Sequence, residues 1–344
     1  MSSRSIRPAR HRVIKNPRHI ALIFTDMIYQ LPQLFPTPKH PNVAVTLSPS
    51  GGKPFMPLAA ALLPDLHFNG DAQCFALYTW EPISDTGPDE PSLFTDASTP
   101  PDVNMEDFKF DFSAPITDQV PVWIDGYQRR DNITDATLAQ YRAHYGNAPK
   151  GEQISKEDIF FYVYALLHHP DYRERYEADL KKMLPRIPMV PGFWDFANIG
   201  RELADLHVNY ESVEPYPLTE TWALDAPADE WEQYRVQKLA WGKTGREKDT
   251  RKLVYNQHLT LSNIPDGIND YQIGGRSPLE WMIDRYQVKV DKKSQIRNDP
   301  NDYFREVGNP RYLADLIKSL VTVSIRTQEL IRALPDLVIE EGTR

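Results

Sequence analysis

The stretch SKEDIFFYVYALL, residues 155–167, decides the fold class of this 344-residue chain. Ser155, followed three residues later by Asp158, resembles a capping box, in which each side chain bonds the backbone N–H of the other residue at a helix start. Residues 159–167 are apolar on every side, which is typical of a helix that is buried all round. Pro170 ends the pattern, because proline cannot continue the hydrogen-bond ladder. The sequence therefore predicts a buried central helix.

Further helices are expected after this one. Residues 171–184 are charged and periodic up to Pro185, and residues 193–207 carry three aromatic side chains that we expect to fill core. Near the end of the chain, Asn309 can cap a long helix whose first turn suits Pro310. The apolar residues of this helix recur at near-helical spacing before Pro335; they are Leu313, Leu316, Ile317, Leu320, Val323 and Leu330.

The rest of the chain has the pattern of short strands separated by loops. Proline accounts for 30 residues and clusters at 32–57 and 82–121, where it interrupts helices and sheet ladders. Strand-like runs occur at 20–24, 42–47, 74–80, 259–264 and 271–273. We predict an α+β fold of mixed short strands with a helical middle layer and a long C-terminal helix. Its expected parts are a basic N-terminal tail (1–19), a β-rich part with an acidic proline-rich loop (20–150), a helical part (151–210), and an α/β part with basic loops and the closing helix (211–334).

Composition favours a cytoplasmic protein. Cys74 is the only cysteine, so the chain can form neither an intrachain disulfide nor a cysteine-rich zinc site, and a reducing compartment is expected. The longest apolar run has nine residues, whereas a membrane-spanning helix needs about 20. The apolar stretch after the basic N-terminus is too short for a secretory signal. We therefore expect no membrane partner.

The charge of the chain is unevenly distributed. Its net charge is −9, but residues 81–135 alone hold 13 acidic residues against 3 basic ones. The remainder carries a net charge of +1, and its basic residues are clustered. Because the local sign of the charge decides which surface can approach phosphate, the total charge does not exclude a nucleic-acid partner.

Basic clusters are the positive candidates for a binding surface. Residues 243–252 carry a net charge of +3 and residues 285–297 one of +4, and both have the composition of loops. Arginine and glutamine can pair with guanine and adenine edges, whereas lysine contacts to phosphate add affinity without sequence information. Solvated surface loops without function are the alternative that spacing leaves open. The candidates for base-edge or backbone contact are Gln128, Arg129, Arg130, Arg246, Arg251 and Arg276, and those for phosphate contact are Lys243, Lys248, Lys252, Lys292 and Lys293.

Motifs for catalysis or metal binding are incomplete. Gly242-Lys243-Thr244 lacks the first glycine of a phosphate-binding loop, because that position is Gln237. Asp171, Asp179 and Lys181 match the residue types of a metal-dependent nuclease, but their segment has the pattern of one amphipathic helix. We therefore expect no catalytic residue, cofactor or metal site in this chain.

Five sequence blocks stand in order along the chain. They are PDLH (64–67) with GDAQCF (70–75), ISKEDIF (154–160) with YVYALLH (162–168), LKKMLPRIP (180–188), RELADLH (201–207), and LEWMIDRYQV (279–288) with NDPN (298–301). Together they resemble the C-terminal specificity, or target-recognition, region of type ISP restriction-modification enzymes, and the resemblance runs from about residue 20 to residue 334.

In that family, one long polypeptide carries a nuclease, an ATP-driven translocase and an adenine-N6 methyltransferase that uses S-adenosylmethionine. The target-recognition domain follows last and serves the defence against foreign DNA. The resemblance covers only this last part, so it implies that catalysis, ATP, S-adenosylmethionine and Mg belong to domains outside this chain. It also implies a double-stranded DNA partner.

The hypothesis is a non-catalytic module that places loops in a DNA groove and positions the target adenine for a neighbouring methyltransferase. One alternative is a protein-interaction module that docks on a methyltransferase or translocase partner without contacting DNA; an exposed apolar stripe on residues 313–334 would favour it. The other is a free-standing nuclease that uses Asp171, Asp179 and Lys181, which a continuous helix there would exclude.

Overall fold

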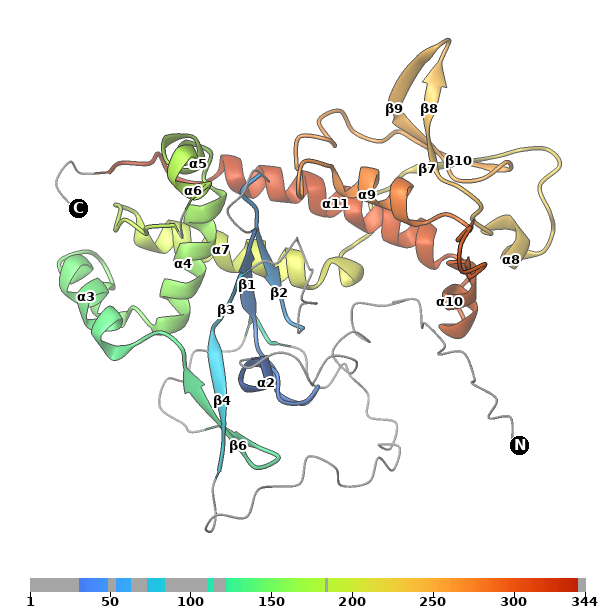
Figure 1. Ribbon diagram of the computed structural model, residues 1–344. Coiled ribbons are helices and arrows are strands. Elements are labelled where there is room, and N and C mark those ends of the chain that lie inside the picture. Colours follow the sequence, from blue (N-terminus) through green and yellow to red (C-terminus); the bar gives the residue numbers. More distant parts are fainter. Residues whose placement is uncertain are drawn as a thin grey trace, which may run out of the picture.

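Three long helices occupy the middle of the molecule, and small antiparallel sheets lie around them (Figure 1). The computed structural model describes residues 31–48, 54–62, 73–83, 110–113, 122–182 and 185–339. The expected N-terminal tail, the strand at 20–24 and most of the acidic proline-rich loop lie outside these residues. Within them the fold is α+β, with short strands, a helical middle layer and a long closing helix, as the sequence predicts.

Two three-stranded antiparallel sheets belong to the N-terminal half, in the orders β2-β1-β3 and β4-β6-β5. The predicted strand at 74–80 is in fact two strands, β3 and β4, in different sheets. The break falls at Leu77, whose side chain is buried in the core and whose N–H donates to the carbonyl of Val43 at 2.8 Å. The elements are α2 (Leu31–Leu34), β1 (Ala44–Leu47), β2 (Pro57–Ala60), β3 (Gln73–Ala76), β4 (Tyr78–Pro82), β5 (Trp123–Ile124), β6 (Tyr127–Asp131) and α3 (Asp135–Tyr145).

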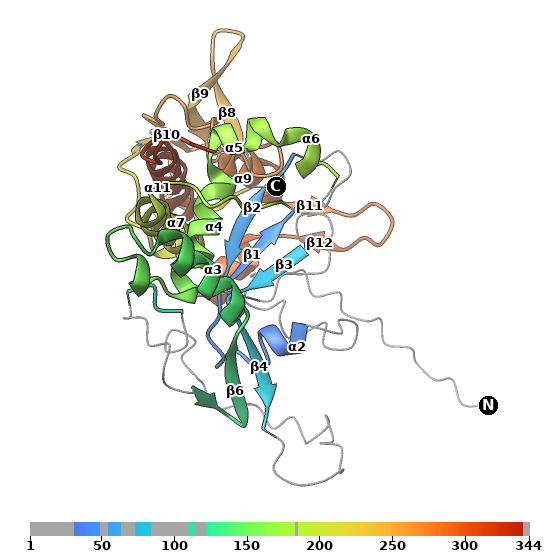
Figure 2. The ribbon, with the colours of Figure 1, turned by 90° about the vertical axis from the view of Figure 1, so that its left-hand side faces the viewer.

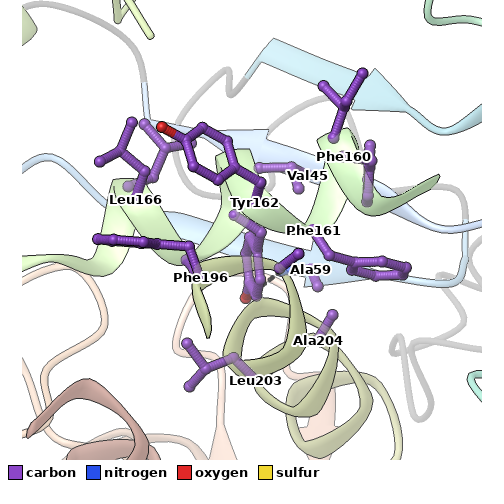
Figure 3. Close-up of a cluster of buried hydrophobic side chains, with 14 of the residues drawn as sticks. Val45, Ala59, Phe160, Phe161, Tyr162, Leu166, Phe196, Leu203 and Ala204 are labelled. Carbon is purple, nitrogen blue, oxygen red and sulfur yellow. Dashed lines mark hydrogen bonds between the residues drawn. The ribbon is translucent and has the colours of Figure 1, made fainter. Parts of the chain in front are cut away.

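The helical middle begins with the predicted capping box. Ser155 Oγ accepts a hydrogen bond from the N–H of Asp158 at 3.1 Å, and the Asp158 carboxylate accepts one from the N–H of Ser155 at 3.0 Å. Helix α4 then buries nearly every side chain against α7 and against β1 and β2 (Figure 3). Gly200 of α7 allows this approach, because a Cβ there would lie 1.9 Å from the carbonyl oxygen of Phe161. The elements are the 3₁₀ turn η2 (Gly151–Gln153), α4 (Lys156–His168), α5 (Pro170–Arg175), α6 (Glu177–Leu180) and α7 (Phe193–Val208).

The segment after α4 is not the single amphipathic helix that the sequence predicts. It splits into α5 and α6 because Tyr176 leaves the helical backbone conformation, with φ −107° and ψ 14°. The rings of Tyr176 and Tyr172 lie 5.0 Å apart, and the Tyr172 hydroxyl donates to the carbonyl of Arg186 at 2.6 Å. This anchoring of tyrosines to the core explains a break that a periodic charge pattern cannot indicate.

A four-stranded antiparallel sheet and a separate hairpin belong to the C-terminal half. The sheet has the order β7-β10-β9-β8, and the hairpin is β11-β12. The run 271–273 forms no strand but only a bridge between Ile273 and Arg276, because Gly274 and Gly275 turn the chain back at once with positive φ. The elements are η3 (Tyr210–Ser212), β7 (Thr219–Trp222), α8 (Glu230–Gln233), β8 (Ala240–Thr244), β9 (Glu247–Val254), β10 (Leu259–Ser262), α9 (Pro278–Arg285), β11 (Lys289–Val290), β12 (Arg297–Asn298), α10 (Asn301–Glu306) and α11 (Tyr312–Arg332).

The closing helix α11 runs beside both halves of the molecule (Figure 1). Leu313 and Ile317 belong to the core of the C-terminal half, and Leu330 packs on the core of the N-terminal half. Asn309 does not cap the helix; its Oδ1 accepts from the N–H of Arg311 at 2.9 Å and closes the turn before it. No large apolar side chain of α11 is exposed, so the stripe that would favour a docking module is covered. Of the helices described, none is sufficiently long and apolar to cross a membrane.

A buried polar junction holds the two halves together. His207 of α7 shares a hydrogen bond with the Tyr164 hydroxyl of α4 at 2.6 Å and another with the Thr327 hydroxyl of α11 at 2.8 Å. The His207 ring stacks on Tyr271 at 5.6 Å between centroids. Burial lowers the pKa of His207, so its imidazole is neutral at pH 7, and one ring nitrogen donates while the other accepts. Three helices are thereby fixed to one another through a single side chain.

Candidate nucleic-acid interface

The basic cluster at 243–252 is not a loop but the β8–β9 hairpin. The two strands are joined by a two-residue turn of Gly245 and Arg246. Gly245 has a φ of +66°, which suits the first position of a type II′ turn and places Arg246 at the tip. Because both faces of the outer hairpin are exposed, its strands lack the apolar alternation by which strands are predicted. The hairpin projects from the body of the molecule (Figure 1).

Two lysines oppose each other next to the turn of this hairpin. Lys243 lies directly opposite Lys248 in the register, whereas Lys252 follows an irregularity in the pairing of the two strands, and its Nζ lies 3.6 Å from Asp249 Oδ2. The Nζ of Lys248 lies 5.3 Å from the centre of the Trp241 ring and 3.3 Å from Glu280 Oε1. Lys243 has no ion-pair partner among the described residues. Since like charges directly opposite each other destabilise a strand pair, this face is electrostatically suited to an anion.

Arg251, on the same strand, is held by a buried carboxylate. Asp249 accepts hydrogen bonds from the Thr244 hydroxyl at 2.8 Å, from the N–H of Arg251 at 3.1 Å and from Arg251 Nε at 3.4 Å. These hydrogen bonds, with that from Thr244 as the largest cause, lower the pKa of Asp249 to about 2. The carboxylate is therefore charged at pH 7 and restricts the rotamers of Arg251.

Helix α9 places further basic side chains next to the hairpin. It begins at a capping box of Ser277 and Glu280, directly after Arg276. The Arg276 guanidinium lies 5.0 Å from the centre of the Trp281 ring and 3.3 Å from the Asp284 carboxylate. The contact between Lys248 and Glu280 described above ties α9 to β9, so Arg276 and the hairpin belong to one surface.

The basic cluster at 285–297 also differs from the expected loop, because it contains the end of α9 and the β11–β12 hairpin. Lys292 and Lys293 lie at the tip, where the Asp291 carboxylate accepts from the N–H of Lys293 at 3.0 Å. Residues 289–297 are all exposed, and the missing apolar alternation again conceals the strands. The N–H of Val288 donates to the carbonyl of Gln237 at 2.9 Å, which joins this hairpin to the segment that leads into β8. The two hairpins point in different directions (Figure 2).

The third candidate group lies apart from the others. Gln128, Arg129 and Arg130 belong to β6, at the opposite end of the molecule from the β8–β9 hairpin (Figures 1 and 2). The Arg129 guanidinium lies over the Tyr78 ring at 4.1 Å, and Arg130 Nε forms an ion pair with Glu81 at 2.9 Å. The fold thus brings eight of the eleven candidates into the C-terminal half and leaves these three elsewhere.

The residues of the nuclease alternative are divided between two short helices and the turn after them. Asp171 belongs to α5 and Asp179 to α6, while Lys181 Nζ pairs with Glu177 at 2.7 Å. No group of three or more histidine, cysteine or acidic side chains in the described part of the chain is placed to hold a metal ion. Burial raises the pKa of Cys74 to about 11, which keeps its thiol protonated and unreactive at pH 7.

Arg297 is a basic residue of this surface that the sequence does not single out. Its Nη2 donates to Asp299 Oδ2 at 2.7 Å. An aspartate two residues after an arginine carries no signal by itself; only the burial of Asp299 in the folded chain distinguishes this pair.

Comparison with known proteins identifies the family. A family model described as the Type ISP C-terminal specificity domain matches residues 6–316. The chain belongs to this family. No curated protein matches the specificity domain at a significant level.

Three solved structures are similar to this specificity domain. The ATP-dependent Type ISP restriction-modification enzyme LlaBIII bound to DNA is 31% identical, with a TM-score of 0.68 over 92% of this chain and 17% of that chain. A nuclease-deletion mutant of the Type ISP enzyme LlaGI in complex with a DNA substrate mimic is 31% identical, with a TM-score of 0.62 over 90% of this chain and 19% of that chain. The DrdV–DNA complex is 30% identical, with a TM-score of 0.67 over 91% of this chain and 26% of that chain. The chain therefore spans about a fifth of the length of these relatives.

Proposed function

We propose that this specificity domain is a DNA sequence-recognition module, which positions duplex DNA for adenine-N6 methylation and ATP-dependent restriction by other domains. The β8–β9 hairpin carries the proposal, because it is a two-stranded ribbon with two opposed lysines next to its turn and an arginine at its tip. The major groove of B-DNA, about 12 Å wide, admits such a ribbon. The similar structures were solved with DNA or a DNA mimic, which supports the same conclusion.

Phosphate contacts fall to the exposed lysines and base-edge contacts to the arginines, because the planar fork of arginine matches the two acceptors of guanine and lysine acts as a point charge. The proposed phosphate contacts are Lys243, Lys248, Lys252, Lys292 and Lys293, and the proposed base contacts are Arg246, Arg251 and Arg276. The β6 residues Gln128, Arg129 and Arg130 are less favoured, since β6 lies at the opposite end of the molecule from the β8–β9 hairpin.

Catalysis is assigned to partner domains. In this proposal the chain has no catalytic activity of its own. It acts in the cytoplasm with methyltransferase, translocase and nuclease domains, which bind S-adenosylmethionine, ATP and Mg. The Gly242-Lys243-Thr244 run supports this assignment, because it lies at the end of strand β8 and not in a loop that precedes a helix. The small share of each relative's length that the chain covers agrees with it.

The test is binding of the purified chain to a randomised duplex pool at about 50 mM and about 200 mM salt, because phosphate contacts weaken with salt whereas base discrimination persists. We expect one sequence to be enriched at both concentrations. Retention of the pool without enrichment would reduce the chain to a general phosphate binder. The absence of any retention would favour the protein-interaction alternative.

A further inference from the structure

Arg297 combines an exposed guanidinium with a buried partner. The Arg297 side chain is 55% exposed, whereas the Asp299 side chain that it contacts at 2.7 Å is only 6% exposed. The Arg251–Asp249 pair has the same character, whereas the Arg130–Glu81 and Arg276–Asp284 pairs join side chains that are both exposed. The Asp299 contact therefore fixes one edge of the Arg297 guanidinium and leaves most of its N–H donors facing solvent.

Asp299 is itself fixed by a second buried side chain. Its Oδ1 accepts hydrogen bonds from the N–H of Asn301 at 3.0 Å and from Asn301 Nδ2 at 2.6 Å. Asn301 in turn accepts from the N–H of Val236 at 2.9 Å and donates to the carbonyl of Val236 at 2.8 Å. Because Val236 is fully buried, a continuous set of hydrogen bonds runs from the core to the guanidinium. The direction of Arg297 is thereby set before any ligand binds.

The hairpin face around Arg297 is open. Val290 of β11 lies directly opposite Arg297 in the register and is 53% exposed. A flexible arginine loses much rotamer entropy when it binds a rigid partner, and a side chain that is already held loses less. An arginine of this kind is suited to selecting one geometry of acceptors, which a flexible phosphate contact does not require.

We propose that Arg297 reads a guanine of the recognised duplex, donating two hydrogen bonds to its O6 and N7 from the major groove. Asp299 and Asn301 act as positioning residues for this contact. Guanine is the base that presents two acceptors in the spacing of the guanidinium fork. The inference rests on the proposed function and adds a named base and named atoms to it.

The experiment uses the full chain and the randomised duplex pool, with the variants Arg297→Ala and Arg297→Lys. Arg305→Ala is the matched control, because Arg305 is exposed on nearby α10 and has no ion pair among the described residues. We expect Arg297→Ala to lose the preference for guanine at one position, by roughly 5- to 150-fold in base discrimination, with the other positions unchanged. Arg297→Lys should restore only part of that preference.

A second measurement isolates the acceptor atom. Replacing the selected guanine by 7-deazaguanine removes N7, so it should weaken binding of the wild-type chain but leave Arg297→Ala unaffected. Asp299→Asn, which keeps the shape of the side chain and removes its charge, should relax the same position partially. A merely structural role for Asp299 would instead lower the affinity equally for all sequences.

The outcomes separate the two proposals. If the wild-type chain enriches no sequence, the proposed function fails, and this inference fails with it. If the wild-type chain does enrich a sequence but Arg297→Ala weakens all duplexes equally and flattens the salt dependence, Arg297 contacts phosphate and only this inference is overturned.

Discussion

Replacing Lys243 by glutamine should weaken DNA binding without destabilising the fold. Lys243 lies directly opposite Lys248 and has no ion-pair partner among the described residues. Directly opposed like charges cost a strand pair roughly 0.2–1 kcal/mol, and Lys243→Gln removes that repulsion. The variant should therefore unfold at the same or a slightly higher concentration of urea than the wild-type chain.

The effect on binding has the opposite sign. Each phosphate contact contributes about −0.9 to the slope of log affinity against log salt. Losing one contact should flatten the measured slope by about that amount, so the affinity ratio between wild type and variant should shrink about 3.5-fold between 50 and 200 mM salt. Fluorescence anisotropy with one labelled duplex at four salt concentrations measures this slope.

Lys182→Gln is the control, because Lys182 is exposed after α6, far from the hairpin along the chain. It should leave the slope unchanged. An unaltered slope in Lys243→Gln would remove Lys243 from the interface. A loss of stability in that variant would show that the opposed lysines are not the source of repulsion that the register indicates.

Two further predictions concern the fold. Gly200→Ala should lower the free energy of unfolding by about 1–3 kcal/mol, since the new Cβ would lie 1.9 Å from the carbonyl oxygen of Phe161. Urea unfolding measures this loss, and an alanine substitution at an exposed position serves as the control. Burial lowers the pKa of His168 to about 4 and that of His207 also falls, so the unfolded chain takes up protons first as the pH drops below 6.5. The free energy of unfolding should be at its full value above pH 6.5 and decrease towards pH 4, with a loss of about 2 kcal/mol at pH 5 from His168 alone. His168→Gln should lose less stability between pH 7 and pH 5 than the wild-type chain. Equal losses in the two proteins would contradict the lowered pKa of His168.

Much of the helical scaffold follows from local sequence signals. Helix α4 is predicted from the capping box at Ser155 and the apolar run after it, and α7 from its aromatic first turn. These signals depend on residues that are close in the sequence, so the sequence alone reveals them. The break at Tyr176 and the late start of α11 are not, because each depends on contacts with distant parts of the chain. The four-part division of the sequence stays a prediction.

The sequence alone predicts only part of the candidate nucleic-acid interface. The basic composition marks the segments that carry the candidates, but both hairpins escape prediction because a ribbon exposed on two faces has no apolar alternation. Arg129 and Arg130 were placed with the others by charge alone, whereas the fold puts them at the far end, on Tyr78 and Glu81. Arg297 needed the burial of Asp299, which no short-range pattern reveals.

The shared packing of α11 constrains how DNA preference can be exchanged between relatives. A chimera that joined the first 210 residues of this chain to a foreign continuation would import a terminal helix shaped for another interior. The donor residues at the positions of Leu330 and Leu334 would then pack on an N-terminal core that does not match them, whereas the donor counterparts of Leu313 and Ile317 would keep their own surroundings. Transplanting single hairpins, or the whole region with its last helix, avoids this mismatch.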